Sequence, residues 1–179
     1  AELGELNDQL LFSTEQNAEE VLNGVYAKYA AQFYQGGNFL QMTTSNTPYY
    51  AGTGANGLEF GQFNISPTSR NLNNVWVEIY SCIDNANNFI TKINSFAPNF
   101  SITERSIGQA KFLRALSYFD LVRVWGEVPL RTELATQETL FLPKSSKQEI
   151  YNQIVKDLTE ATTELPSQEY LVGRPLSYA

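Results

Sequence analysis

Apolar side chains recur every three or four residues in four stretches of the chain, and this spacing predicts four long α-helices. The first helix is expected to begin at Asn17, which together with Glu20 has the pattern of a capping box. The paired glycines Gly36 and Gly37 predict its end. Residues 1–16 show no such period, and we expect them to be extended or irregular.

The second and third helices have the strongest apolar patterns. A continuous stripe predicts a helix over residues 71–95. The third helix is expected to begin near Ser101 or Thr103, with Ser101 and Glu104 at the spacing of a capping box, and Gly126 predicts its end. Residues 112–125 are apolar on more than one face, which is typical of a helix packed between neighbours.

A third capping-box pattern, Ser146 with Glu149, predicts the start of the fourth helix, and Leu165 followed by proline predicts its end. Residues 127–144, which precede it, are expected to be irregular. The sequence therefore indicates an all-α fold of tetratricopeptide-like helix pairs with one long irregular aromatic loop, although no clean internal repeat is visible.

The long loop covers residues 36–70, where Gly, Asn, Thr, Ser and Pro replace the helical pattern. A connection of this length is usually functional or disordered, and its Tyr and Phe residues argue against disorder. Flat rings can stack on sugars, and amide or guanidinium groups can form hydrogen bonds with hydroxyls. The candidate ligand contacts are Tyr49, Tyr50, Asn46, Asn56, Phe60, Asn64 and Arg70. Alternatively, this is an ordinary surface loop whose aromatic residues anchor it to the core.

Charge and composition narrow the chemistry. The formal net charge is −7 and the basic residues are scattered, which argues against nucleic-acid binding. The chain has no His, which excludes Ser-His-Asp and Cys-His catalysis, and no carboxylate pair suggests glycoside hydrolysis. We expect no enzyme activity, no cofactor and no metal site. The single cysteine, Cys82, lies in an apolar helical stretch and is expected to be buried.

Five segments, taken in order, carry a resemblance to a known family. They are residues 18–26, residues 76–87 with the pattern W-x3-Y-x2-I-x2-[AC]-N, residues 104–130, residues 143–166, and the pair Gly173 and Arg174. The third is the most specific, because it contains the stretch AKFLRALSYFDLVRVWGEVPL. Together they resemble the N-terminal part of the SusD/RagB family.

The resemblance implies that residues 1–179 form a single N-terminal helical domain, truncated from a longer protein. It also implies a non-catalytic lipoprotein at the extracellular face of the outer membrane, with a lipid anchor outside this chain. The implied partners are an oligosaccharide and a SusC-like TonB-dependent transporter. Glycan contacts in the loop between the first two helices agree with the resemblance.

The residues that carry the resemblance are expected to be structural. Arg114, Tyr118 and Arg123 lie among core residues, and the arginines are expected to pair with an acid such as Glu104 or Asp120. The same structural role is expected of the tryptophans Trp76 and Trp125.

The leading hypothesis is therefore non-catalytic capture of an oligosaccharide for delivery to the transporter. A second hypothesis is a helical-repeat scaffold that binds proteins or peptides and has no sugar role. A glycoside hydrolase is disfavoured. Replacement of Tyr49 and Tyr50 by Ala would separate the first two hypotheses, because only a glycan-binding loop requires both rings for sugar binding.

Overall fold

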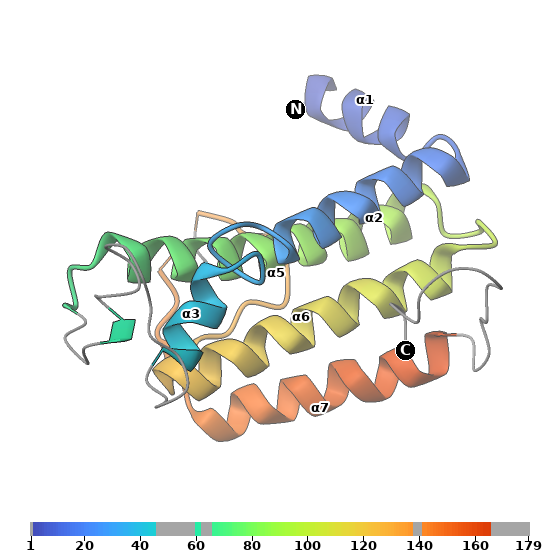
Figure 1. Cartoon of the computed structure of the whole chain (residues 1–179). Helices are drawn as coiled ribbons and strands as arrows, with labels where there is room; N and C mark the ends of the chain where they lie inside the picture. Colours follow the sequence, from blue (N-terminus) through green and yellow to red (C-terminus); the bar gives the residue numbers. More distant parts are fainter. Residues whose placement is uncertain (1, 46–59, 62–65, 138–140, 166–179) are drawn as a thin grey trace, which may run out of the picture.

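The computed structural model describes residues 2–45, 60–61, 66–137 and 141–165 (Figure 1). Among these residues, no helix is both long and apolar enough to cross a bilayer. The elements, in chain order, are α1 (Glu2–Leu11), α2 (Glu15–Tyr29), α3 (Asn38–Thr44), α5 (Arg70–Phe96), α6 (Thr103–Trp125), β1 (Val128–Pro129), β2 (Lys144–Ser145) and α7 (Lys147–Glu164).

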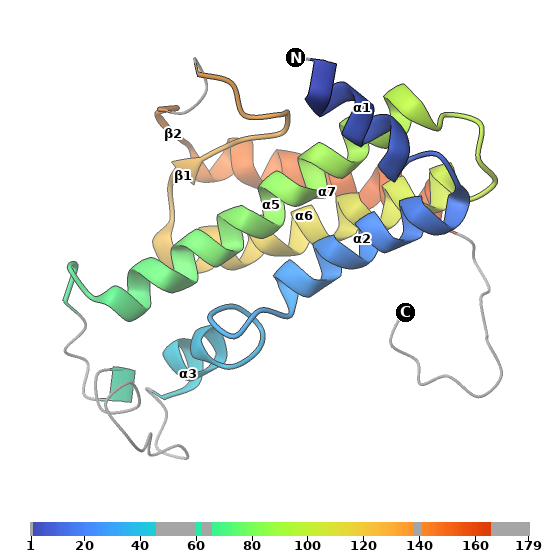
Figure 2. The ribbon, with the colours of Figure 1, turned by 90° about the horizontal axis from the view of Figure 1, so that it is seen from above.

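Helix α6 lies at the centre of the helical layer. It packs against α7 and α5 and also contacts α2, an arrangement that Figure 2 shows from above. Its buried residues lie on more than one face and include Leu113, Tyr118 and Leu121, each at most 2% exposed. The prediction of a helix packed between neighbours is therefore confirmed.

One hydrophobic cluster joins α2, α3, α5, α6 and α7. Cys82 is buried in it, as predicted, and burial raises the pKa of its thiol to about 11. The tryptophans, predicted to be part of the core, are half-buried and pack against it. The rings of Trp76 and Trp125 meet edge to face, with centroids 5.3 Å apart, and Tyr80 lies beside Trp76 at 4.9 Å.

Three predicted helices are confirmed near their expected bounds. Helix α5 begins one residue early because Ser69 caps it, and its side chain accepts a hydrogen bond from the Leu72 amide. Gly126 ends α6 with φ of 76°, a conformation that favours glycine. Helix α7 has the complete capping box predicted for Ser146 and Glu149.

The prediction for residues 1–29 was wrong in two respects. Residues 2–11 form α1 rather than an irregular segment. The first long helix begins at Glu15, because Thr14 is its cap and accepts a hydrogen bond from the Asn17 amide at 3.1 Å. The Asn17 side chain instead donates to the Leu10 carbonyl at 3.2 Å, so it holds the α1–α2 turn.

The expected end of that helix and the expected loop were also displaced. Helix α2 ends at Tyr29, well before the paired glycines, and the chain then turns so that Tyr34 enters the core. Residues 38–44, which were predicted to be part of the loop, form α3. Its N-cap is Gly37, whose φ of 152° lies in the region that favours glycine.

Ser101 was predicted to cap α6, but this prediction was wrong because Ser101 forms hydrogen bonds with α2 instead. The carboxylate of Glu15 accepts hydrogen bonds from the Ser101 amide at 2.7 Å and from its hydroxyl at 2.8 Å. The N-cap of α6 is Ile102, without a side-chain hydrogen bond. Within 127–144, predicted to be irregular, Val128 and Pro129 pair antiparallel with Ser145 and Lys144.

The residues of the family signature build a buried network, here called the arginine node and defined as Arg114, Asp157 and Asn87. Arg114 donates to both carboxylate oxygens of Asp157 at 2.7 and 2.8 Å, and to the Asn87 side-chain oxygen at 2.7 Å. The Asn87 amide donates to the carbonyls of Arg131 and Glu133. The node therefore joins α5, α6 and α7 to the chain segment that leaves α6.

This confirms the structural role predicted for Arg114, with a change of partner, whereas Arg123 is exposed rather than among core residues. Arg123 pairs with Asp120, as the sequence suggested. Arg114 pairs with Asp157 of α7 rather than with Glu104 or Asp120. Tyr118 also holds the segment that leaves α6. Its hydroxyl donates a hydrogen bond to the backbone carbonyl of Arg131 and accepts one from the backbone amide of Arg131.

Candidate functional site

The predicted aromatic loop leaves and rejoins the described structure at one place. Helix α3 ends at Thr44, and the buried Ser45 follows it. Gly61 lies beside Ser45, because a β-carbon added to Gly61 would be 3.7 Å from the Ser45 carbonyl oxygen. The two sides of the loop therefore meet at the α3 end of the helical layer, on the left of Figure 1.

Phe60 anchors this junction. Its ring is completely buried and belongs to the hydrophobic core. A ring without an exposed face cannot stack on a ligand, so the structure assigns Phe60 the anchoring role that the sequence left as an alternative. The remaining candidates in this loop, Asn46, Tyr49, Tyr50, Asn56 and Asn64, lie outside the described residues.

Arg70, the last candidate, is exposed at the first position of α5. No acidic residue lies in the first turn of this helix. A cation at this end is opposed by the helix dipole, typically by about 0.3–1 kcal/mol. Helix stability therefore does not account for Arg70, and its side chain is available at the loop end of the molecule.

A second anchor fixes the chain between α2 and α3. The Asp120 carboxylate of α6 accepts hydrogen bonds from the Tyr34 hydroxyl at 2.8 Å and from the Gln35 side-chain amide at 3.0 Å. Burial, and after it the Asp120 charge, raise the pKa of Tyr34 far above its ordinary value. Tyr34 therefore stays a neutral donor, and α3 is positioned by the central helix.

Two buried polar atoms at α3 have no hydrogen-bond partner. They are the side-chain nitrogen of Asn38, a residue 6% exposed, and the hydroxyl of Ser45, a residue 3% exposed. An unsatisfied buried polar group costs about 1–3 kcal/mol. Such groups call for a functional explanation, and these two lie on the element that leads into the predicted loop.

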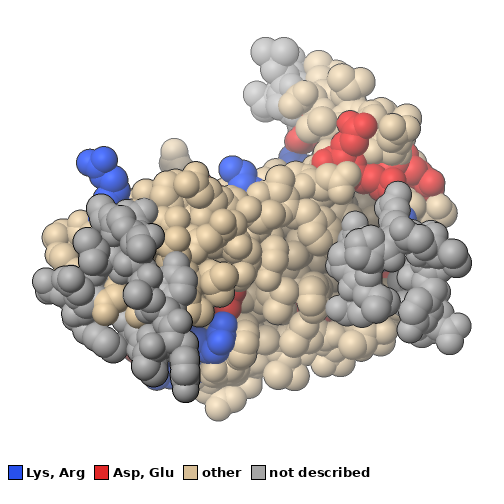
Figure 3. All heavy atoms as spheres, viewed as in Figure 1, with Lys and Arg blue, Asp and Glu red and all other residues tan. Residues whose placement is uncertain are grey.

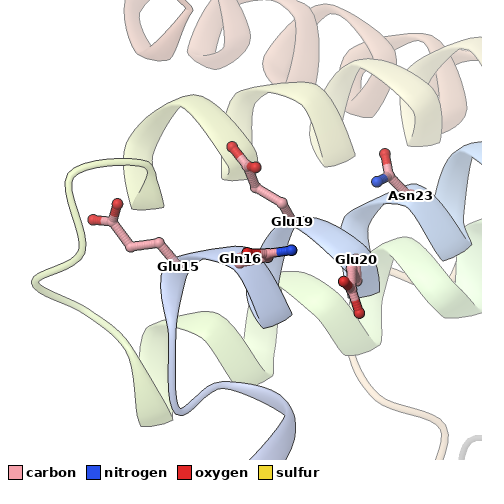
Figure 4. A pocket seen from close by; sticks show the side chains of 5 residues that line it. All are labelled: Glu15, Gln16, Glu19, Glu20 and Asn23. Carbon is pink, nitrogen blue, oxygen red and sulfur yellow. The ribbon is translucent and has the colours of Figure 1, made fainter.

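A shallow acidic hollow lies at the other end of α2, and Figure 4 shows its lining. It is lined by Glu15, Gln16, Glu19, Glu20 and Asn23. No sequence motif pointed to it, and it is remote from the aromatic loop. Within the described ranges there is no group of three or more His, Cys, Asp or Glu residues that could hold a metal ion.

Sequence reasoning missed Asn38, Ser45 and Asp120 as parts of this end of the molecule. Asn38 follows the paired glycines directly, and that polar stretch was the available signal. The role of Asp120 could not be read locally, because its partner Tyr34 is 86 positions away.

Comparison with known proteins establishes the family. The family described as "Starch-binding associating with outer membrane", SusD-like, matches residues 3–179. The chain therefore belongs to the SusD-like family, as the ordered motifs predicted. A curated relative, SusD-like protein P38 of Formosa agariphila, is 39% identical over 104 residues, which cover 57% of this chain and 20% of the relative.

Solved structures agree on the fold. A SusD homolog from Bacteroides thetaiotaomicron has a TM-score of 0.77 at 23% identity, over 90% of this chain and 32% of its own. A "Laminarin binding SusD-like protein" has a TM-score of 0.70 at 31% identity, over 86% and 34%. The all-α, tetratricopeptide-like prediction is confirmed. The chain spans about a third of these structures and a fifth of the first relative.

Proposed function

We propose that the full-length protein binds an oligosaccharide without cleaving it, and that this chain supplies an N-terminal helical domain with one part of the binding surface. One observation carries the proposal. The aromatic, amide-rich segment begins and ends on a fixed base, formed by Ser45, Phe60 and Gly61, beside two unsatisfied buried polar atoms. A binding segment held on rigid helices is pre-organised, and pre-organisation lowers the entropy lost on binding.

In this proposal the loop residues divide the work. Tyr49 and Tyr50 stack on the apolar faces of sugar rings. The polar contacts to sugar hydroxyls come from Asn46, Asn56, Asn64 and Arg70. Phe60 contacts no ligand, because its buried ring holds the base of the segment. Family membership supports carbohydrate as the ligand class, since one structural relative is named as laminarin-binding.

We further propose that the bound glycan is delivered to a SusC-like TonB-dependent transporter. The family description supports association with the outer membrane. A lipid anchor in a part of the protein outside this chain would hold it at the extracellular face, as the resemblance implies.

The test is electrophoresis of the full-length protein through gels that contain glycans, with laminarin as the first probe. The double variant Tyr49→Ala and Tyr50→Ala should be retarded much less, with affinity about 5- to 150-fold weaker, because each lost ring contact is worth about 0.5–1.5 kcal/mol. Tyr151→Ala is the matched control, since this tyrosine is 39% exposed on α7 and lies outside the predicted loop of residues 36–70.

Two results would contradict the proposal. Unchanged retardation of the double variant would remove the loop from the site. Absence of retardation for the unaltered protein across β-glucan, α-glucan and xyloglucan gels would favour the alternative, a helical scaffold that binds proteins. Release of reducing sugar from a retained glycan would contradict the non-catalytic role.

A further inference from the structure

Helix α1 is attached to the bundle at the end opposite to α3 (Figures 1 and 2). Phe12, just after the helix, is 3% exposed and packs on Phe89 of α5 with ring centroids 6.0 Å apart. Asp8 forms an ion pair with Lys92, also on α5. These contacts fix α1 to α5 while leaving much of its surface in solvent.

Three leucines of α1 are exposed to solvent, beside the exposed polar residues Asn7 and Gln9. Leu6 is 61% exposed, Leu10 is 67% exposed and Leu11 is 40% exposed. Leu6 and Leu10 are four residues apart and therefore lie one turn apart on the same face. Helices that insert into a groove on another protein present anchors with this spacing. A ten-residue helix is only marginally stable by itself in water and depends on packing against the rest of the protein. Because these leucines are exposed, they contribute little of that packing.

The surroundings of these leucines are acidic. The first twenty residues contain six Asp or Glu residues and no Lys or Arg. Figure 3 shows acidic side chains gathered where α1 meets the bundle. Glu15, Glu19 and Glu20 line the hollow there, and the hydrogen bond from Asn17 to the Leu10 carbonyl joins the hollow to α1.

The negative charge of this area is only partly neutralised. Glu19 pairs with Arg105, whereas Glu15 accepts its hydrogen bonds from the neutral side chain and backbone of Ser101. A complementary surface would therefore be basic around an apolar centre.

We propose that α1 is a docking helix for a second protein. Leu6, Leu10 and Leu11 enter an apolar groove on that protein, and Lys or Arg residues at the rim of the groove face Glu15 and Glu20. A second copy of this chain does not fit, because a two-fold contact would bring like charges together. An anionic lipid surface does not fit either, because it binds apolar helices with basic flanks.

The test places a photo-crosslinking amino acid at position 10 of the full-length protein, expressed in its native cells. Val155 of α7, which is 61% exposed, is the control position. Position 10 should crosslink to one protein that position 155 does not reach. That protein is then identified by mass spectrometry and purified, and its affinity is measured directly.

Two variants examine the contact itself. The double variant Leu6→Ser and Leu10→Ser should bind the purified partner at least tenfold more weakly, while Val155→Ser changes the affinity less than twofold. Gln16→Lys with Glu20→Lys should weaken binding and reduce its salt dependence, because the charge complementarity is reversed. Both variants leave the Glu15 contacts to Ser101 in place.

Crosslinks from position 10 only within its own polypeptide, only to lipid, only to a second copy, or to nothing would overturn the proposal. So would unchanged affinity of the leucine variant for the identified partner. The leucines are exposed, so their replacement should change stability by no more than about 0.5 kcal/mol. Glycan retardation should be unaffected, because the junction of Ser45 and Gly61 lies at the opposite end from α1. Failure of either proposal can therefore be told from failure of the other.

Discussion

The arginine node and the α3 end treat buried polar groups in opposite ways. At the node, Arg114, Asp157 and Asn87 satisfy one another and the backbone of the segment after α6. At the α3 end, the Asn38 amide and the Ser45 hydroxyl are buried without a partner in the described structure.

The strongest sequence motif of this chain, the family signature on α6, has a structural role, so the ligand-binding residues are to be sought elsewhere. A satisfied buried network fixes one arrangement of helices, and its residues are fully used by that task. Unsatisfied groups lower stability and are retained when another selective reason exists. The recognisable signature thus identifies the family. Unsatisfied buried atoms also occur on Ser106 of α6, Asp84 of α5 and Glu164 of α7. What distinguishes Asn38 and Ser45 is that they adjoin the junction of Ser45 and Gly61, where we propose the ligand site.

The largest expected effect comes from breaking the node. Arg114→Met should lower the free energy of unfolding by about 3–5 kcal/mol, because it leaves the Asp157 carboxylate buried and unpaired. Urea unfolding measures the loss, and the double variant Arg114→Met with Asp157→Leu should recover part of it. A loss below about 1 kcal/mol would mean that the node does not hold the helices together.

The next effect should come from the loop anchor. Phe60→Ala should destabilise the protein by about 3 kcal/mol, because it leaves a cavity in the core. It should also weaken glycan retardation, since the segment loses its fixed base. Phe141→Ala is the control: this ring is 92% exposed, and its removal should cost no more than about 0.5 kcal/mol. Equal melting temperatures for the two variants would contradict the anchoring role.

A smaller effect, with the opposite sign, is expected at the unsatisfied groups. Ser45→Ala should raise the free energy of unfolding by about 1 kcal/mol, because it removes a buried hydroxyl without a partner. If that hydroxyl serves ligand binding, glycan affinity should fall at the same time. Paired unfolding and gel-retardation measurements check both parts, and a destabilised variant would show that the hydroxyl is satisfied in solution.

The smallest effect concerns the exposed cap of α7. Hydrogen bonds from the Ser146 hydroxyl and amide lower the pKa of Glu149. A carboxyl with a lowered pKa in the folded state stabilises the protein above its unfolded pKa, and this contribution is lost as the pH falls through the folded value. The melting temperature of Glu149→Gln should therefore lie slightly below that of the unaltered protein at pH 7 and converge with it near pH 3.

Local patterns sufficed for α5, α6 and α7 because the groups that end or cap them are near in sequence. Ser146 with Glu149 and the glycine at 126 are examples. The failures have distant causes. Ser101 resembles a cap, but Glu15, 86 positions away, occupies it. Helix α1 is held by the packing of Phe12 on Phe89, and the spacing of apolar residues within α1 cannot predict a contact with so distant a residue.

The candidate site was predictable only as a region. An aromatic residue in a polar loop can present its ring to a ligand or bury it, and composition alone does not separate the two. Phe60 is buried. The lack of partners at Asn38 and Ser45 is a property of the folded arrangement, so the polar stretch after the paired glycines could indicate the region but not the two unsatisfied atoms.

The meeting of Ser45 and Gly61 has a consequence for how such proteins diversify. Because the two sides are already together, the entropy of closing the intervening segment grows only slowly with its length. Insertions, deletions and replacements between these residues can therefore accumulate without displacing the helices. If the segment binds glycan as we propose, grafting the corresponding segment of a relative between positions 45 and 60 should transfer ligand preference onto an unchanged helical frame.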